Sequence, residues 1–384
     1  MKSRNIQYLV QVDHVRAFAA LWIILYHGEQ VLGAAIGYGR MFTPDLWHHT
    51  ANPLAAVLFE GHSAVALFMV LSGFIFTYGA YGKHVVYRAF IINRLLRIYP
   101  LYIAIILLGL SVYPSRFTLS ALITTILPLA NIQTLQAGTF LAMAWAVAVE
   151  FQFYLLYPFL VMYLNKSVVR TVIATLAVAL LFRLLGLAFW ANPRELGYWH
   201  LIGRMDQFIL GMGSAVLLKQ IAGRTQWLRI LLILSIPIAI GTLFGFHRLG
   251  GWPSAAPWKI IWPTVEGLIW SLFIIGYVGT PRFLPRWLET PLAKVGELSF
   301  SLYLLHFPII DAIHYRVGRL PQWTGNPSMD GLLLSLVIVV PITLACSLIT
   351  YRAIELPFLN LRVPYLKPIE ESPLFRKEHR SRAG

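Results

Sequence analysis

The chain has 384 residues, of which 58% are hydrophobic and 12% are charged, and its formal net charge is +15. Its mean hydropathy of +0.67 lies far from that of soluble domains. These figures exclude a soluble globular protein and predict an all-α integral membrane protein. Its basic residues lie mainly beside apolar segments, where lysine and arginine set topology and contact lipid headgroups, so we expect membrane lipid and no nucleic acid as a partner.

Ten apolar segments are long enough to cross a bilayer. A further apolar segment, 119–130, is short and contains Pro128, and the distribution of charge indicates that it does not cross. With a cytoplasmic N-terminus and no crossing at 119–130, most lysines and arginines fall on the cytoplasmic side, whereas a crossing there would invert every later loop. The predicted spans are 15–34, 63–81, 95–113, 141–164, 168–190, 205–222, 227–246, 258–279, 296–316 and 329–351.

The predicted fold therefore has about ten transmembrane helices, both termini in the cytoplasm, and a re-entrant or interfacial segment at 119–130. Residues 1–355 form the predicted transmembrane domain. Residues 356–384 form a basic cytoplasmic tail that we expect to be disordered. Asp13, His14 and Arg16 interrupt the first apolar segment, so we expect it to be retained rather than cleaved as a signal peptide.

Arg16 and His27 lie eleven residues apart, which returns both side chains to nearly the same helix face about 16 Å apart along the axis. Asp13 is placed to pair with Arg16. An imidazole about half a bilayer deep is costly and indicates a function. Neutral His27 has the chemistry of a general base that accepts a proton from a hydroxyl.

Further candidates follow along the chain. Ser72 and Gly73 are small residues that let helices approach closely. Arg94 and Arg97 share a helix face at the cytoplasmic end of a span, where guanidinium groups suit phosphates. Topological positive charge is the alternative reading for this pair.

Glu150 lies inside a span and must pair with a cation, accept hydrogen bonds, or face an aqueous cavity, and the region of Arg204 and Asp206 is a candidate partner. His306 is a second histidine within a span. We expect Arg183 and Glu266, both inside spans, to neutralise one another as a structural pair. The segment of Glu60 and His62 lies at the outer end of the second span.

Five motifs together resemble, in order, those of the acyltransferase-3 family, the integral-membrane O-acyltransferases of bacterial surface and secreted glycans. The resemblance runs from about residue 8 to 355. The motifs are Arg16 with ten residues before His27, the segment 68–74 ending in Leu-Ser-Gly-Phe, Arg94-Leu-Leu-Arg97-Ile-Tyr-Pro, Trp145 to Tyr154 with Glu150, and Ser299-Phe-Ser-Leu-Tyr-Leu-Leu-His306-Phe-Pro.

The resemblance implies a multi-pass protein of the bacterial inner membrane that transfers an acyl group, commonly acetyl from acetyl-CoA, to a carbohydrate hydroxyl on an acceptor that is either free or lipid-linked. Many relatives have two acidic residues where this chain has Glu150-Phe151, and an Asp where it has Ala66, so we assign the acidic role to Glu150 alone. We expect no esterase-like domain beyond the tail. The predicted site comprises catalytic His27 and Glu150, acyl-CoA-binding Arg16, Arg94 and Arg97, and substrate-binding His306, Asp206 and His62, with no metal.

A second class of function stays open at this point. Buried His27, Glu150 and His306 suit a proton relay in a proton-coupled secondary transporter. Against this reading, the sequence shows no two matching halves. The sequence also leaves open whether His27 takes only a proton or also the acyl group.

Overall fold

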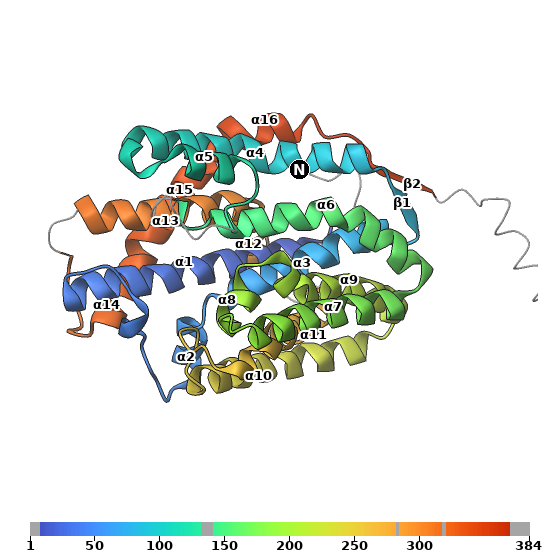
Figure 1. Ribbon diagram of the computed structural model, residues 1–384, viewed down its shortest axis with the longest axis horizontal. Coiled ribbons are helices and arrows are strands. Elements are labelled where there is room, and N and C mark those ends of the chain that lie inside the picture. The colour runs from blue at the N-terminus through green and yellow to red at the C-terminus, as the bar shows by residue number, and fades with distance from the viewer. Residues whose placement is uncertain (1–7, 132–140, 282–283, 317–319, 369–384) are drawn as a thin grey trace, which may run out of the picture.

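The computed structural model describes residues 8–131, 141–281, 284–316 and 320–368, which form a bundle of long helices (Figure 1). The long helices are α1 (Val10–Tyr38), α3 (Ser63–Ala80), α4 (Tyr87–Val112), α6 (Ala144–Lys166), α7 (Val168–Ala188), α9 (Leu201–Ile221), α10 (Thr225–Arg248), α11 (Trp262–Gly279) and α13 (Ser299–Arg316). The shorter helices are α2 (Pro53–Phe59), α5 (Leu119–Ile126), α8 (Pro193–Tyr198), α12 (Arg286–Glu297), α14 (Pro327–Leu334), α15 (Val340–Thr350) and α16 (Leu356–Leu359). The π-helical turns Ser335–Val339 and Tyr351–Glu355 join α14, α15 and α16 into one continuous segment, and 3₁₀ turns occupy Pro44–Leu46, Pro114–Arg116 and Pro257–Ile261.

Within the described residues, nine helical segments are long and apolar enough to cross a membrane, and each coincides with a predicted span. The remaining predicted span, 296–316, forms the 18-residue helix α13. Its His306, Asp311 and His314 make it less apolar than the nine. Because α13 packs against α1 and α15, His306 and Asp311 are almost completely buried in protein. The predicted all-α membrane architecture is confirmed.

Helix α5 has only eight residues, so it is about 12 Å long and too short to cross a bilayer. It lies against α4, where the hydroxyl of Tyr99 donates to the Ile126 carbonyl (2.9 Å) and that of Tyr102 to the Thr125 carbonyl (3.0 Å). The prediction that 119–130 does not cross is therefore confirmed.

The segment after α15 packs at the end of the bundle where α3 ends and α4 begins. Strand β1 (Lys83–Val85) pairs antiparallel with β2 (Leu366–Pro368), and Figure 1 shows both at the right-hand end of the bundle, called here the strand-pair end. Asn93 exchanges two hydrogen bonds with the backbone of Val363, at 2.7 and 3.0 Å. Tyr365 is buried against Phe90, with ring centroids 5.2 Å apart.

The predicted disordered tail is therefore wrong for residues 356–368, which form α16, an ordered turn and β2. Strand pairing supplies the backbone hydrogen bonds that the segment itself cannot make. The rest of the predicted tail, 369–384, lies outside the described residues.

Helices α3 and α9 cross with their backbones in contact. A Cβ atom on Gly73 would lie 2.1 Å from the Phe208 carbonyl oxygen, and one on Gly211 would lie 2.0 Å from that of Val70. The prediction that Gly73 permits close helix packing is confirmed. This packing fixes one face of α3 and leaves the residues on its other side available to line a cavity.

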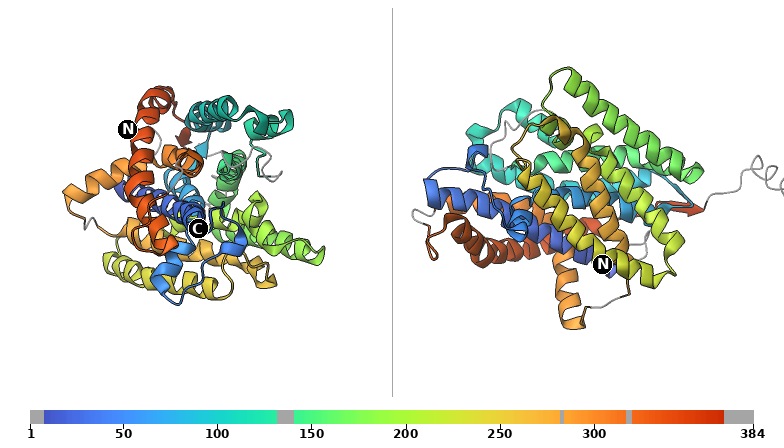
Figure 2. Two further views of the ribbon diagram at one scale, coloured as in Figure 1. Left: turned by 90° about the vertical axis from the view of Figure 1, so that its left-hand side faces the viewer. Right: turned by 90° about the horizontal axis from the view of Figure 1, so that it is seen from below.

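Helix α12 leaves the bundle, and Figure 2 shows it standing away from the other helices. Its last turn contacts α1, where a Cβ on Gly296 would lie 1.9 Å from the Asp13 carbonyl oxygen. One ring nitrogen of His14 also lies 3.2 Å from the Glu289 carbonyl oxygen. These contacts hold the first turns of α1, which carry Arg16.

Candidate active site

A cavity opens between α1, α3, α4, α6 and α13, with an empty volume of about 890 Å³ including the part open to solvent. Along α3 it extends from Phe76 to Val65, which corresponds to about 16 Å of helix. Its charged and polar lining residues are Arg16, Ser72, Arg94, Arg97, Glu150, Tyr154, Ser299 and Tyr303. The remaining lining is apolar, and residues from five helices meet at the cavity although they are scattered through the sequence.

Arg94 lines the cavity without a carboxylate partner. Its guanidinium carbon lies 4.7 Å from the ring centre of Phe76 and 5.4 Å from that of Phe90. None of the ion pairs formed by the described residues involves Arg94, and its Nε has no hydrogen-bond partner. Aromatic faces stabilise the cation without neutralising it, so Arg94 can still bind an anion.

The other two predicted arginines line the same cavity and have carboxylate partners. Arg16 donates to Asp13 at 2.9 Å, as the sequence predicts. Arg97 donates to Glu355 at 3.0 Å, and Glu355 also accepts from Ser301. Since Glu355 is 1% exposed, this pair also ties α4 to the π-helical turn before α16.

Arg362 is a fourth guanidinium near this cluster, and the sequence reading missed it because it assigned this residue to the tail. Burial and the charges of Arg94 and Arg97 lower the pKa of Arg362 to about 9. Its Nε has no hydrogen-bond partner among the described residues. Arg362 thus adds a buried positive charge near Arg94 and Arg97, and clustered positive charge favours an anionic ligand.

Glu150 faces the cavity from α6 and accepts hydrogen bonds at one oxygen from two hydroxyls. Ser72 on α3 donates at 2.8 Å, and Tyr154, one turn along α6, donates as well. The predicted partner region at Arg204 and Asp206 does not contact it. The sequence indicates only a packing role for Ser72, whereas the structure places its hydroxyl on Glu150.

His27 and His306 lie 279 residues apart in sequence and stack with an interplanar angle of 13°. His306 Nδ1 lies 3.1 Å from the Leu302 carbonyl oxygen, which only accepts hydrogen bonds, so this nitrogen carries a proton. His306 Nε2 is then an acceptor, and it lies 3.0 Å from His27 Nδ1. His27 Nδ1 therefore donates, and the lone pair of His27 is on Nε2.

This chain of hydrogen bonds fixes the tautomer that a general base requires. His27 is partly exposed, whereas His306 is fully buried. His27 itself is outside the cavity lining, but Tyr303, one turn before His306 on α13, is part of it. The ring centroids of Tyr303 and His306 lie 5.8 Å apart. The inner part of the cavity therefore ends close to the two histidines.

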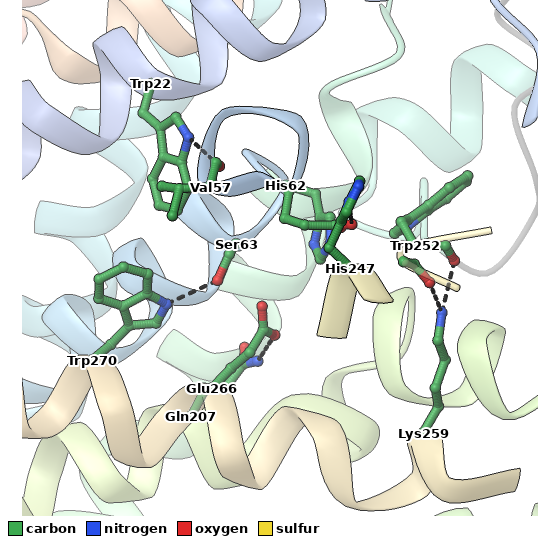
Figure 3. Close-up of polar contacts among 12 residues, drawn as sticks. Trp22, Val57, His62, Ser63, Gln207, His247, Trp252, Lys259, Glu266 and Trp270 are labelled. Atoms are coloured by element: carbon green, nitrogen blue, oxygen red, sulfur yellow. Dashed lines mark hydrogen bonds and ion pairs between the residues drawn. The ribbon is translucent and has the colours of Figure 1, made fainter. Parts of the chain in front are cut away.

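Glu60, His62 and His247 form a buried cluster, called here the Glu60 cluster; Figure 3 shows its two histidines together. The His62 ring centroid lies 6.3 Å from that of Tyr26, the residue before His27. Glu60 lies 3.0 Å from His62 Nε2 and 2.8 Å from His247 Nδ1, and the Thr50 backbone N–H donates to His247 Nε2. Burial raises the pKa of Glu60, but the hydrogen bonds from His247 and His62 outweigh it and the net shift is downward. His62, predicted to bind substrate, is 3% exposed here.

Asp206 lies in a different buried network, between α7, α9 and α11. Arg183 Nη1 donates to Asp206 at 2.9 Å, and Thr264 donates to the same carboxylate oxygen at 2.6 Å. The expected pair of Arg183 with Glu266 is therefore wrong, because the rotation of α9 brings Asp206 to Arg183 first. Glu266 instead accepts from Gln207 at 3.2 Å (Figure 3). The predicted acceptor-binding role of Asp206 stays a prediction.

The described residues contain no group of three or more His, Cys, Asp or Glu side chains arranged to hold a metal ion.

The family described as "Acyltransferase domain" matches residues 9–352, which is most of the chain. Similar curated proteins are named "O-acetyltransferase OatA", from Staphylococcus aureus strains NCTC 8325 / PS 47, COL and MRSA252. Each is 27% identical over 228 residues, which cover 56% of this chain and 35% of the relative, so the match spans about a third of the length of these proteins. No solved structure matches significantly. The family match favours acyl transfer over the transporter that the sequence left open, and the chain belongs to the acyltransferase-3 family of membrane acyltransferases.

Proposed function

We propose that this membrane acyltransferase moves an acyl group from cytoplasmic acyl-CoA to a hydroxyl of a carbohydrate, such as an exopolysaccharide, a lipopolysaccharide or a lipid-linked glycan precursor. The observation that carries the proposal is the cavity, which runs from an arginine cluster to Tyr303, one turn before His306 of the His27–His306 pair. The acyl group in this proposal is acetyl, because similar curated proteins are named O-acetyltransferases. The strand-pair end faces the bacterial cytoplasm in this proposal, as the positive-inside rule predicts.

Coenzyme A suits the charge pattern of this cavity. It is soluble and polyanionic, so its phosphates bind Arg94, with Arg16, Arg97 and Arg362 contributing positive potential. Its pantetheine arm follows the apolar wall of α3 and carries the thioester toward the inner end of the cavity. The cavity extends about 16 Å along α3, the same rise as that between Arg16 and His27 on α1.

The chemistry follows from the tautomer of His27. As the acceptor oxygen bonds to the thioester carbon, His27 Nε2 takes the hydroxyl proton, and the hydrogen bond to His306 stabilises the imidazolium. When the carbon–sulfur bond breaks, the leaving thiolate takes that proton, which yields an ester and coenzyme A. Glu150, held by Ser72 and Tyr154, supplies negative charge near the cavity wall and orients the bound substrates.

His27 Nε2 can instead attack the thioester first and form an acyl-imidazole, which the acceptor hydroxyl then cleaves. Incubating the purified protein with labelled acetyl-CoA and no acceptor separates the two orders. A labelled protein that loses its label when His27 is replaced supports the acyl-imidazole. No retained label supports direct transfer.

Membrane vesicles supplied with radiolabelled acetyl-CoA test the function itself. We expect label to move to carbohydrate or lipid-linked sugar, and His27→Gln, which keeps the size of the side chain but is not a base, to slow this transfer at least ~100-fold. A correctly inserted His27→Gln protein that transfers at the normal rate contradicts the proposal. Solute uptake without label transfer would support the transporter instead.

A further inference from the structure

Tyr303 occupies a distinctive place on α13. The face of this helix that borders the cavity carries Ser299, Phe300 and Tyr303 in succession, and His306 follows one turn later. One turn corresponds to a rise of about 5 Å. Tyr303 is therefore the last cavity-lining residue of α13 before the histidine pair.

Among the residues that the structure describes, the phenol hydroxyl of Tyr303 finds no hydrogen-bond partner, although Tyr303 is only 8% exposed. Tyr154, on another wall of the cavity, differs because its hydroxyl donates to Glu150. A buried hydroxyl that makes no hydrogen bond destabilises a protein. At the wall of a cavity, a bound ligand can supply the missing acceptor.

Arg204 favours an acceptor that gains negative charge near this hydroxyl. Its positive charge acts on the Tyr303 phenol, and the charge of Glu150 acts in the opposite direction. Arg204 is 1% exposed and donates to the Tyr198 carbonyl at 2.6 Å and to Gln207 at 3.0 Å. It also lies 3.5 Å from the sulfur of Met69, a cavity-lining residue.

None of the ion pairs formed within the described part of the chain neutralises Arg204. The nearby carboxylates of Glu266 and Asp206 weaken its positive potential, and the remainder reaches the inner end of the cavity through low-dielectric protein.

We propose that Tyr303 is a catalytic residue whose hydroxyl donates a hydrogen bond to the carbonyl oxygen of the acyl thioester. This inference rests on the proposed function. As the acceptor oxygen attacks the carbonyl carbon, the carbonyl oxygen becomes an oxyanion, and the hydrogen bond from Tyr303 strengthens with it. The phenol keeps its proton throughout, and Arg204 supplies a positive field behind it. His27 and Tyr303 then act on opposite sides of the reacting carbon.

The test compares Tyr303→Phe with wild-type protein in the labelled acetyl-CoA assay. Removing one oxyanion-hole donor lowers kcat by about 10²–10³-fold. Because the hydrogen bond matters mainly in the transition state, we expect the KM for acetyl-CoA and the Kd for free coenzyme A to stay within about twofold. Tyr157→Phe is the control, since the Tyr157 hydroxyl is also buried but lies outside the cavity lining.

A Tyr303→Phe protein with wild-type kcat overturns the inference, and so does one whose only change is a higher KM. If wild-type protein transfers no label at all, the proposed function fails and not the role of Tyr303. Should Tyr303→Phe fold poorly, 3-fluorotyrosine at position 303 keeps a hydroxyl donor of nearly the same size. We expect it to retain at least half of wild-type kcat, and a fall as large as ~100-fold in this folded variant would contradict the inference.

Discussion

The cavity between α1, α3, α4, α6 and α13 and the network between α7, α9 and α11 both bury charged side chains, but the partners of these side chains differ. In the network, Arg183 donates to Asp206, to the Gly203 carbonyl and to Thr264, so its charge is neutralised and held in place. In the cavity, Arg94 is held by aromatic rings, and the hydroxyl of Tyr303 has no hydrogen-bond partner in the part of the chain that the structure describes.

The difference indicates which intramembrane charges bind ligands. A charge that is paired with a buried carboxylate holds helices together, because removing either partner leaves a buried charge alone. A charged or polar group that borders a cavity and lacks such a partner can form hydrogen bonds with a substrate. Burial alone does not separate the two classes, since Arg183 is fully buried and Arg94 is 9% exposed.

Breaking the network between α7, α9 and α11 should have the largest effect, a loss of folding stability. Arg183→Met leaves the Asp206 carboxylate buried and unpaired, so we expect it to lower the free energy of unfolding by ~3–5 kcal/mol. Thermal unfolding in detergent measures this loss. The double variant Arg183→Met/Asp206→Leu removes both charges and should recover most of the stability.

The same double variant tests the predicted acceptor-binding role of Asp206. Normal acyl transfer per folded molecule would leave Asp206 with a structural role only. A stable double variant with a raised KM for the acceptor would support the prediction.

Removing His306, the hydrogen-bond partner of His27, should slow acyl transfer and leave the fold intact. His306→Phe fills the same space but cannot accept the hydrogen bond from His27 Nδ1, so we expect kcat to fall by ~100-fold with little change in unfolding temperature. His306→Gln retains an acceptor oxygen and should recover part of the rate. Equal loss in both variants would argue that His306 acts through packing and not through the hydrogen bond.

Substitutions of the cavity arginines should raise the KM for acetyl-CoA by different amounts. Arg94 has no carboxylate partner, so Arg94→Gln should raise the KM for acetyl-CoA about tenfold or more. Arg97→Gln should raise it less and should also lower stability, because it leaves buried Glu355 without its cation. An unchanged KM in Arg94→Gln would contradict a role in binding coenzyme A.

A substitution in the Glu60 cluster should have the smallest effect on the free energy of unfolding, and this effect should depend on pH. The pKa of Glu60 is lower in the folded protein than its ordinary value of 4.5. Its ionised form therefore adds stability that is present above about pH 4.5 and is lost as the pH falls through the folded-state pKa.

Glu60→Gln should accordingly lower the free energy of unfolding by about 1 kcal/mol at pH 7 and by less in acid. Unfolding temperatures measured between pH 7 and pH 4 check this. Parallel curves for wild type and variant would show that the carboxylate does not contribute through its charge.

The sequence predicts most of the fold because hydrophobicity and charge act locally along the chain. Span positions, the short helix α5 and the pairing of Asp13 with Arg16 all follow from neighbouring residues. The segment 360–368 could not be predicted in this way. Its order depends on β1 and Asn93, which lie far away in the sequence and supply its hydrogen-bond partners.

The candidate site is predictable as a set of residues but not as a geometry. Arg16, Arg94, Arg97 and Glu150 all line the cavity, as a shared site requires. The contact between His27 and His306 and the choice of Asp206 over Glu266 by Arg183 depend on the rotation of one helix against another. Single-sequence periodicity gives the face of a helix but not the neighbour that meets it.

Cysteine protection tests most directly whether the cavity is the donor site. Cys346 is the only cysteine, so Val147→Cys in a Cys346→Ser background places a single thiol in the cavity wall. At a coenzyme A concentration about ten times its dissociation constant, occupancy should slow alkylation of this thiol about tenfold. Cys346 in the unaltered protein lies on α15 outside the cavity lining and should react at the same rate with and without coenzyme A. Alkylation at position 147 that is unaffected by coenzyme A, in a protein that still transfers acetyl groups, would contradict the account.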